Sequence, residues 1–573
     1  MYNRLRDTLR SNAQMLRQKG SFAQNFAITF SGTALVAVIG LLVTPVMARI
    51  YAPASYGLFA VFNSIVNNVN LLSTLAYPPA FLLPRLRKRF LALVHLTLLL
   101  TVGAFVIVGI GVLLLHRQLL HWLNAEALGG WFYLVPVTVF IFNLNMIMGA
   151  WYLRSKDFKK RAGVEVSTSL AGRGLTIGYG LLTHGVPGGL ILGDIFGRVT
   201  GFFTLLLSGI HRHLGELWHA YSWARVKAVA YEYREYPFYV MPTGYLNVLA
   251  AQLPIFFLTS GFGAATVGLY SFSTTLLELP INLIGNAVAP VFLQKATETH
   301  AQDPERLKQL CLDLFNKLLY LGLLPFGIIT VFGDVLFKFA FGARWEMAGV
   351  FTGYLGFYYV FKLTSYATSP IYAVFRRQRL ALLGTVLLVL VRVASLSIGL
   401  YTHNLNLAML LFGISSLVVT FGVDLNILHL LGLPVGRVAV RSIALVAGTL
   451  AVLFALRLGG LAAWQHLRRA EAPPRPAAKV KHPPAPAQRS GAGRVQSGPL
   501  AGREAVAAAP VGSGPVAGSR RPVPPVAVPA PPDPLVRVRF TPLGMRRQLR
   551  REPPVSIGSA RRHRNFVPPP HRP

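Results

Sequence analysis

Charged residues and cysteine are scarce in this sequence of 573 residues. Asp, Glu, Lys and Arg together make up 13% of it, about half the share that is typical of a soluble domain, whereas apolar residues make up 53%. This composition argues against a water-soluble globular protein. The only cysteine, Cys311, excludes intrachain disulfides and cysteine-based zinc sites.

Motifs for covalent chemistry are also missing. No glycine-rich loop ends in Lys-Ser or Lys-Thr, so no phosphate-binding loop for ATP is predicted, and the His-Glu-x-x-His zinc motif is absent. The loops between apolar segments are short, and the longest of them, 211–236, cannot house a catalytic domain. We therefore predict no enzymatic activity, no cofactor and no metal site, and expect binding and conformational change instead.

Long apolar segments dominate the first 470 residues. A hydrocarbon layer about 30 Å thick is crossed by roughly 20 apolar residues of helix. The sequence therefore predicts an all-α polytopic membrane protein with about twelve transmembrane helices, and the segment 437–459 is a candidate for a thirteenth. The twelve segments lie near 24–49, 57–77, 90–115, 131–153, 162–183, 187–210, 237–260, 265–293, 313–340, 347–375, 380–401 and 406–431.

Lys and Arg residues are concentrated in every second loop between the predicted spans. The N-terminus and every second loop after it hold 24 of them, whereas the other loops hold only Arg117 and Arg344. Cytoplasmic loops are enriched in Lys and Arg, so the alternation predicts twelve spans with the N-terminus in the cytoplasm. If segment 437–459 also spans, it places the following residues outside, against this bias.

A short internal similarity suggests that the chain consists of two related halves. Residues 52–60 align with 263–271, and each stretch joins the first two helices of a six-helix set. Chance similarity between two short apolar loops is the alternative reading. Two facing six-helix lobes are typical of an alternating-access transporter with its site between them. We predict a first lobe at 24–210, a cytoplasmic linker at 211–236 and a second lobe at 237–431.

The two ends of the chain differ in composition from these lobes. Residues 1–23 are predicted to form a cytoplasmic basic amphipathic segment, and 432–470 are a candidate extra helix. Residues 471–573 contain 23 of the 39 prolines and carry 18 Lys and Arg against 4 acids. Such a Pro/Arg-rich tail cannot bury enough apolar surface to offset its ordering entropy, so we predict that it is disordered.

Charged residues inside the spans are the candidates for function, because a charge at mid-bilayer costs about 2.5–3.5 kcal/mol on insertion scales. We predict that cations from both halves line a cavity and bind an anionic substrate. Asp194 and Glu278 are candidates for binding a coupling ion, although Asp194 could equally form a structural ion pair one helical turn away. Asp424 lies nearer the end of its span and ranks lower. The cations are Arg173, Arg198, Lys362 and Arg392.

A stripe of small residues accompanies two of these charges. The sixth predicted span carries glycines at a strict spacing of four, which place a smooth strip along one helix face. We predict that a neighbouring helix packs closely against it, as static packing or as a sliding surface. The glycines are Gly189, Gly193, Gly197 and Gly201.

Several stretches together resemble one family of membrane proteins. The apolar run that ends in "RIYAPASYG" at 49–57 resembles the opening of oligosaccharide (O-antigen-type) flippases of the multidrug/oligosaccharidyl-lipid/polysaccharide (MOP) exporter superfamily. The stretches "YREYPFYVMPTGYLN", "QLPIFFLTSGFGAATVGLYSFSTTLLELPINLIGNAVAPVF" and "FGARWEMAGV" are similar to the same family in order and spacing. The resemblance covers about residues 20–435; the tail departs from the family pattern.

The resemblance implies a flippase that moves an undecaprenyl-diphosphate-linked oligosaccharide across a bacterial inner membrane for cell-surface polysaccharide or lipopolysaccharide synthesis. Its expected partners are the lipid-linked oligosaccharide, membrane lipid and polysaccharide polymerase or assembly proteins, and no nucleic acid. Three alternatives stay open: a multidrug/cation antiporter of the same superfamily, a membrane-embedded glycosyl polymerase, and a non-catalytic scaffold of a polysaccharide-assembly complex. Cationic spans disfavour the antiporter, and short loops disfavour the polymerase.

Overall fold

The first half of the chain forms six long helices in the computed structural model, which describes residues 22–155 and 157–471. Each of these helices overlaps one predicted span. The predicted basic segment 1–23 and tail 471–573 lie outside the described residues, apart from residues 22, 23 and 471. The six helices are α2 (Phe22–Ile50), α3 (Pro53–Thr74), α4 (Arg87–Trp122), α5 (Val135–Arg154), α6 (Phe158–Thr183) and α7 (Gly188–Leu207).

The second half is also built of helices joined by short turns, with no strand among its described residues. Its longest element, α10 (Met241–Pro280), has 40 residues and would be about 60 Å long if continuous, twice the thickness of the hydrocarbon layer. Gly263, with φ 81° and ψ 170°, breaks it into the two spans predicted from the sequence. The elements that follow are η5 (Ile281–Gly285), α11 (Asn286–Gln302), α12 (Pro304–Phe341), α13 (Glu346–Thr368), α14 (Ile371–Val374), α15 (Gln378–Tyr401) and α16 (Leu405–Leu430).

Short helical elements form the connections. The predicted linker contains α8 (Leu214–His219) and α9 (Trp223–Glu232), and α9 turns Val226 and Val229 into the protein interior. Among the described residues, nine helical stretches are long and apolar enough to cross a membrane, including the 67-residue stretch Tyr236–Gln302 that Gly263 divides. The protein is therefore an all-α polytopic membrane protein. The remaining short elements are η1 (Pro78–Leu82), η2 (Glu126–Leu134), η3 (Ile210–His213), η4 (Tyr236–Val240) and η6 (Ala343–Trp345).

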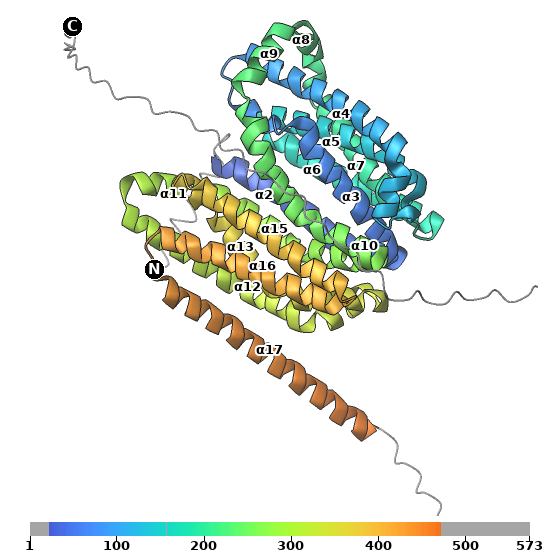
Figure 1. The fold of residues 1–573 in the computed structure, drawn as a ribbon, viewed down its shortest axis with the longest axis vertical. Helices are drawn as coiled ribbons and strands as arrows, with labels where there is room; N and C mark the ends of the chain where they lie inside the picture. The colour runs from blue at the N-terminus through green and yellow to red at the C-terminus, as the bar shows by residue number, and fades with distance from the viewer. Residues whose placement is uncertain (1–21, 156, 472–573) are drawn as a thin grey trace, which may run out of the picture. The chain divides into compact units, whose positions relative to one another are not determined.

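The two similar sequence stretches pack against each other. A Cβ on Gly57 of α3 would collide with the carbonyl oxygen of Ala264, and a Cβ on Gly268 of α10 would collide with that of Pro53. Pro53 and Gly57 lie 211 residues before Ala264 and Gly268, so the contact is reciprocal under the proposed repeat. This reciprocity supports a true duplication rather than chance similarity. Figure 1 shows α2 and α10 between a group formed by α3 to α7 and a group formed by α11 to α16.

An aromatic cluster adds a second contact between the halves at the same end of α3. The indole Nε1 of Trp345 donates a hydrogen bond to the carbonyl of Ala48, at 2.8 Å. Phe272 stacks on the Trp345 ring with 4.1 Å between centroids, and Tyr56 meets the same ring edge-on at 5.1 Å. Trp345 is fully buried, so this indole closes the space between the halves at the predicted outer ends of the helices.

The segment predicted as a thirteenth span forms α17 (Val435–Glu471), which packs on α12. Arg441 hydrogen-bonds the hydroxyl of Tyr320, Leu453 faces Gly327, and Arg457 forms an ion pair with Asp334 at 2.5 Å. Along α17 these contacts run from residue 441 to residue 457, and their partners on α12 run in the same order from residue 320 to residue 334. The two helices are therefore parallel. In Figure 1, α17 follows the edge of the second group of helices.

Candidate functional site

A cavity of about 680 Å³ lies between helices of the first half and α10 of the second half. Its volume falls within the range of about 300–1,000 Å³ that is usual for ligand sites. The first half contributes the charged side chains of this lining, and α10 contributes amides, hydroxyls and apolar groups. The polar residues that line it are Thr44, Tyr56, Asn63, Asn67, Thr168, Ser169, Arg173, Thr176, Asp194, Arg198, Gln252, Ser271, Thr274 and Thr275.

Close packing of α6 on α7 positions the three charged residues of the cavity. Gly172 of α6 faces the backbone of Gly193 and Gly197 of α7, so near that a Cβ on Gly172 would lie 2.8 Å from the Gly193 carbonyl oxygen. The glycine stripe predicted from the sequence therefore does pack against a neighbouring helix. Arg173 and Asp194 each follow one of these contact glycines in the sequence, and both reach the same cavity.

Asp194 and Arg198 form the ion pair that their spacing predicted. Arg198 Nε donates to Asp194 Oδ2 at 2.7 Å, and the two side chains are 22% and 20% exposed. The guanidinium also lies over the ring of Phe142, with 4.4 Å from Cζ to the centroid. Arg198 is therefore neutralised in this conformation, although it still lines the cavity.

Arg173 lines the same cavity without an acidic partner. Its Nε donates to the hydroxyl of Ser169, at 3.1 Å, and no described carboxylate lies within ion-pair distance of it. Gly40 of α2 makes room for the guanidinium, because a Cβ there would lie 2.9 Å from Nη2. The cavity thus contains one cation that the described residues leave unneutralised, and its net charge is +1.

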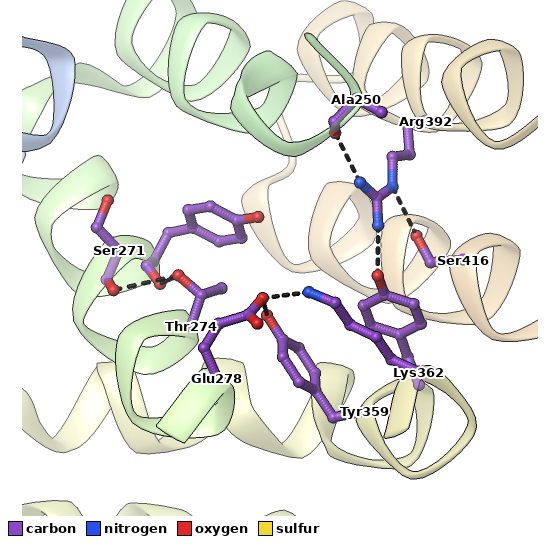
Figure 2. A network of polar contacts seen from close by, with 10 residues as sticks. Ala250, Ser271, Thr274, Glu278, Tyr359, Lys362, Arg392 and Ser416 are labelled. Carbon is purple, nitrogen blue, oxygen red and sulfur yellow. Dashed lines mark hydrogen bonds and ion pairs between the residues drawn. The ribbon is translucent and has the colours of Figure 1, made fainter. Parts of the chain in front are cut away.

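Lys362 and Glu278, two further predicted residues, form an ion pair outside the cavity lining (Figure 2). The Tyr359 hydroxyl donates to Glu278 Oε1 at 3.3 Å, and Lys362 Nζ lies 4.9 Å from the centroid of that ring. About a third of each charged side chain is exposed. Glu278 is one residue before Leu279 and three after Thr275, and both of these line the cavity, so α10 connects the two sites.

Arg392 is buried, and neutral acceptors satisfy it (Figure 2). Its Nη1 donates to the carbonyl of Ala250 at 2.6 Å, its Nη2 to the hydroxyl of Tyr358 at 2.7 Å, and its Nε to Ser416 Oγ at 3.1 Å. Ala250 lies four residues before Pro254, which lacks the N–H that a helix would supply to this carbonyl. Arg392 therefore replaces the hydrogen bond lost at a proline and joins α10, α13 and α16.

The structure divides the predicted residues into three groups. Arg173, Asp194 and Arg198 share the cavity, Glu278 and Lys362 form a neighbouring pair, and Arg392 binds backbone and hydroxyl groups away from the cavity. The cations that line this cavity, Arg173 and Arg198, both come from the first half. That cations of both halves bind a substrate stays a prediction. No group of three or more His, Cys, Asp or Glu side chains is placed to bind a metal ion within residues 22–155 and 157–471.

A comparison with protein families decides the identity. The model of the family described as "Polysaccharide biosynthesis protein" matches residues 46–349, more than half of the chain. The chain belongs to this polysaccharide biosynthesis family. No curated protein matches it.

Solved structures show that this polysaccharide biosynthesis protein has a transporter fold. One similar structure is an inward-facing multidrug resistance MATE family transporter of the MOP superfamily, with 16% identity, a TM-score of 0.53, and coverage of 74% of this chain and 97% of that one. Another is the lipid II flippase MurJ in an inward closed conformation, with 13% identity, a TM-score of 0.56, and coverage of 75% and 92%. These likenesses confirm the fold that the resemblance in the sequence implied.

Sequence reasoning missed the uncharged part of the cavity of this family member. Asn63 and Asn67 are four residues apart on α3, and Gln252 and Thr274 approach from α10. Amides inside an apolar span are uncommon enough to be a signal, and their i, i+4 spacing places them on one face. The search for charges alone passed over them.

Proposed function

We propose that the chain is a flippase that moves an undecaprenyl-diphosphate-linked oligosaccharide across a bacterial inner membrane for surface polysaccharide or lipopolysaccharide synthesis, including O-antigen. The observation that carries the proposal is Arg173, an unneutralised guanidinium in a cavity whose lining also holds the Asp194–Arg198 ion pair, amides, hydroxyls and apolar groups. The family and the transporter fold support transport of a polysaccharide precursor. No catalytic step is part of the proposal.

A diphosphate-linked sugar fits the chemistry of this cavity. A guanidinium binds phosphate through paired, charge-assisted hydrogen bonds, which suits Arg173 and, once its ion pair opens, Arg198. Asn63, Asn67 and Gln252 present both donors and acceptors, as sugar hydroxyls require. The apolar lipid tail needs no protein cavity, because it can stay in the bilayer while the headgroup crosses.

A cationic drug fits the cavity less well, although the MATE transporter shares the fold. Among the described residues, the one acid that lines the cavity, Asp194, is paired with Arg198, and Arg173 adds an uncompensated positive charge. A cationic ligand would meet like charge in a low-dielectric space, whereas an anionic ligand would neutralise it. The charge of the cavity therefore favours the anionic substrate over the multidrug/cation antiporter.

Alternating access provides the movement. The halves meet through the Gly57 and Gly268 contact and the Trp345 cluster at the predicted outer ends, so these contacts must separate for outward release. We propose that Lys362 receives the phosphates after the second half moves, when its pair with Glu278 opens. Asp194 and Glu278 then remain candidates for a coupling ion, since each loses its basic partner to the substrate.

Depletion of the protein in its native cell tests the proposal. We expect a lipid-diphosphate-linked oligosaccharide to accumulate in the inner membrane with its sugar on the cytoplasmic face, shielded from an impermeant lectin in right-side-out vesicles. Surface polysaccharide should fall in parallel. Accumulation of the complete intermediate on the outer leaflet would instead indicate a polymerase or an assembly scaffold and contradict the proposal.

A further inference from the structure

The cavity has two walls of different chemistry. Its described charged residues, Arg173, Asp194 and Arg198, all lie on α6 and α7, which pack against each other. Its described amides all lie on α3 and α10, which form a second packed pair. A diphosphate bound to Arg173 therefore lies against the first wall and leaves the second wall to another part of the substrate. The amides of the second wall are Asn63, Asn67 and Gln252.

The cavity amides of α3 lack the hydrogen bonds that the other asparagines of α3 and α5 make. Neither Asn63 nor Asn67 forms a side-chain hydrogen bond with any residue of 22–155 or 157–471. The unused amide groups are therefore a feature of the cavity and not of asparagine in these helices. Away from the cavity, the bonds run from Asn68 Nδ2 to the carbonyl of Ser64 at 2.8 Å, from Asn70 Nδ2 to Asn143 Oδ1 at 2.5 Å, from Asn143 Nδ2 to Ser73 Oγ at 2.7 Å and from Asn145 Nδ2 to the carbonyl of Arg198 at 2.9 Å.

The second half also supplies unpaired polar groups to this wall. Gln252 lies before the break in α10 at Gly263 and Ser271 after it, and both line the cavity. Neither side chain has a hydrogen-bond partner within the described part of the chain, although Ser271 Oγ is buried. Figure 2 shows Ser271 close to the turn of α10 that carries Glu278. The unpaired groups therefore come from both halves, and we call Asn63, Asn67, Gln252 and Ser271 the amide cluster.

The amide cluster suits sugar hydroxyls better than phosphates. Each amide presents an NH₂ group, which donates, and a carbonyl oxygen, which needs a donor. A lipid diphosphate at neutral pH accepts hydrogen bonds but donates none, whereas a sugar hydroxyl does both. Phe59 lies one helical turn before Asn63 and lines the same cavity, so its ring offers an apolar face to the C–H groups of a sugar ring. A sugar can therefore satisfy this wall, and a diphosphate alone cannot.

We propose that the amide cluster is a sugar subsite that joins the two halves, beside a diphosphate subsite at Arg173. The inference rests on the proposed flippase function and deepens it by naming the part of the substrate that permits transport. A ligand shifts a conformational equilibrium only through contacts that differ between the conformations. The described charged residues of the lining all belong to the first half, so they hold a diphosphate to that half alone. A sugar that also binds α10 connects the halves, and only a glycosylated lipid is moved at the full rate.

Binding of two lipids to the purified full-length protein separates the two subsites. The probes are undecaprenyl diphosphate, which carries no sugar, and an undecaprenyl-diphosphate-linked oligosaccharide. In Asn67→Leu the affinity for the sugar-linked lipid should fall by about fivefold or more, the contribution of one neutral hydrogen bond, while the affinity for undecaprenyl diphosphate stays unchanged. Arg173→Ala should weaken the binding of both lipids.

The matched control for this binding experiment is Asn68→Leu. Asn68 is the next residue on α3 but does not line the cavity, so this variant should bind both lipids as the wild type does. Unchanged binding of undecaprenyl diphosphate also shows that a variant is folded. If Asn67→Leu lost affinity for both lipids equally, or for neither, the sugar subsite would be overturned.

Flipping in proteoliposomes tests whether the sugar permits movement. At saturating concentrations the wild type should flip the sugar-linked lipid at least about tenfold faster than undecaprenyl diphosphate, because the latter forms none of the hydrogen bonds to the amide cluster. An impermeant phosphatase measures the accessibility of undecaprenyl diphosphate, which should also compete with the sugar-linked lipid. Gln252→Leu and Ser271→Ala should lower the maximal rate for the sugar-linked lipid. Equal maximal rates for the two lipids in the wild type would contradict the sugar subsite and leave the proposed function intact, whereas a wild type that binds neither lipid would contradict the proposed function itself.

Discussion

Three arginines in similar apolar surroundings are satisfied in three different ways. Arg198 has a carboxylate, Arg392 has a carbonyl and two hydroxyls, and Arg173 has a single serine hydroxyl. A guanidinium has five N–H donors, and Arg173 and Arg198 each use only Nε in these bonds, but only Arg198 has its charge neutralised by a described carboxylate. The position of Arg173 beside the cavity makes it the residue on which recognition of an anion depends most.

Replacement of Arg173 tests this difference. Arg173→Ala should weaken substrate affinity by about 1.5–3 kcal/mol, the usual contribution of hydrogen bonds to charged groups, or at least about tenfold. Arg173→Lys should recover part of it, because the charge remains but the paired geometry is lost. The measurement is the concentration dependence of flipping, normalised to protein in the membrane. Arg441→Ala, a basic residue on α17, is the matched control and should behave as wild type; an equal loss in both variants would contradict the assignment.

Arg392 and Pro254 should depend on each other energetically. Arg392→Ala leaves the carbonyl of Ala250 without a donor and should destabilise the protein by at least about 1.5–3 kcal/mol. Pro254→Ala restores the missing backbone N–H, so the arginine should matter less in that background. A double-mutant cycle on unfolding in detergent measures this coupling, expected at about 0.5–3 kcal/mol. If the effects of the two substitutions on the free energy of unfolding were additive, the Arg392 guanidinium would not be replacing the hydrogen bond that Pro254 removes.

The sequence showed which charged residues lie inside the predicted spans, but it predicted only one of the contacts that they make. Asp194 and Arg198 pair within one helix, so their spacing alone predicted the contact. Lys362 and Glu278 are 84 residues apart, and Arg392 reaches Ala250 across 142, and no local pattern encodes these contacts. Arg392 was therefore predicted to be a cavity residue, whereas the fold directs it to a carbonyl exposed by a proline.

The positions of the helices, in contrast, could be predicted closely from the lengths of the apolar segments. All twelve predicted spans overlap helices, including the two that Gly263 separates within α10. The boundaries deviate where helices extend beyond the apolar layer, as α12 does from Pro304. The partner of α17 was not predictable, because its Arg457 pairs with Asp334 of α12 across 123 residues of sequence, and no local pattern encodes that contact.

The glycine contact between α3 and α10 can be tested at the scale of two helices. In Gly57→Ala and Gly268→Ala the new methyl group meets backbone carbonyls, which cannot rotate away, so each variant should lose about 1–3 kcal/mol of stability and flip more slowly. Gly103→Ala in α4 is the control, since nothing lies near its Cβ position and alanine favours a helix. Thermal unfolding in detergent reports the difference. Wild-type stability in Gly57→Ala would contradict the close contact.

For the whole molecule, the alternation of basic loops and the parallel course of α12 and α17 make one joint prediction of topology. Single cysteines are introduced in a background with Cys311 replaced. In intact cells an impermeant thiol reagent should label positions at the predicted outer turns, here Ala54, His184 and Thr402. Gly185, which lies in the same turn as His184, is not used as a cysteine position. It is buried with φ 80°, and a Cβ there would collide with the Ile50 carbonyl. Ala462, beyond the membrane-crossing part of α17, should be labelled with this outer set.

Cysteines at the predicted inner turns provide the opposite set, namely Leu86, Gln302 and Gln378, all at exposed positions. They should stay unlabelled in intact cells and react after permeabilisation. Labelling of this set in sealed cells would invert the orientation. If Ala462 instead behaved like the inner set, α17 would not cross the membrane beside α12.

Flipping by the purified protein is the most direct test of the central claim, that the cavity beside Arg173 carries a lipid-diphosphate-linked oligosaccharide between leaflets. In proteoliposomes with this lipid in both leaflets, a sugar-oxidising reagent outside should consume about half of the lipid when no protein is present. With the wild-type protein nearly all of it should become accessible, and with Arg173→Ala the approach should be slower by about tenfold or more. Wild-type liposomes in which half of the lipid stays protected would contradict the account.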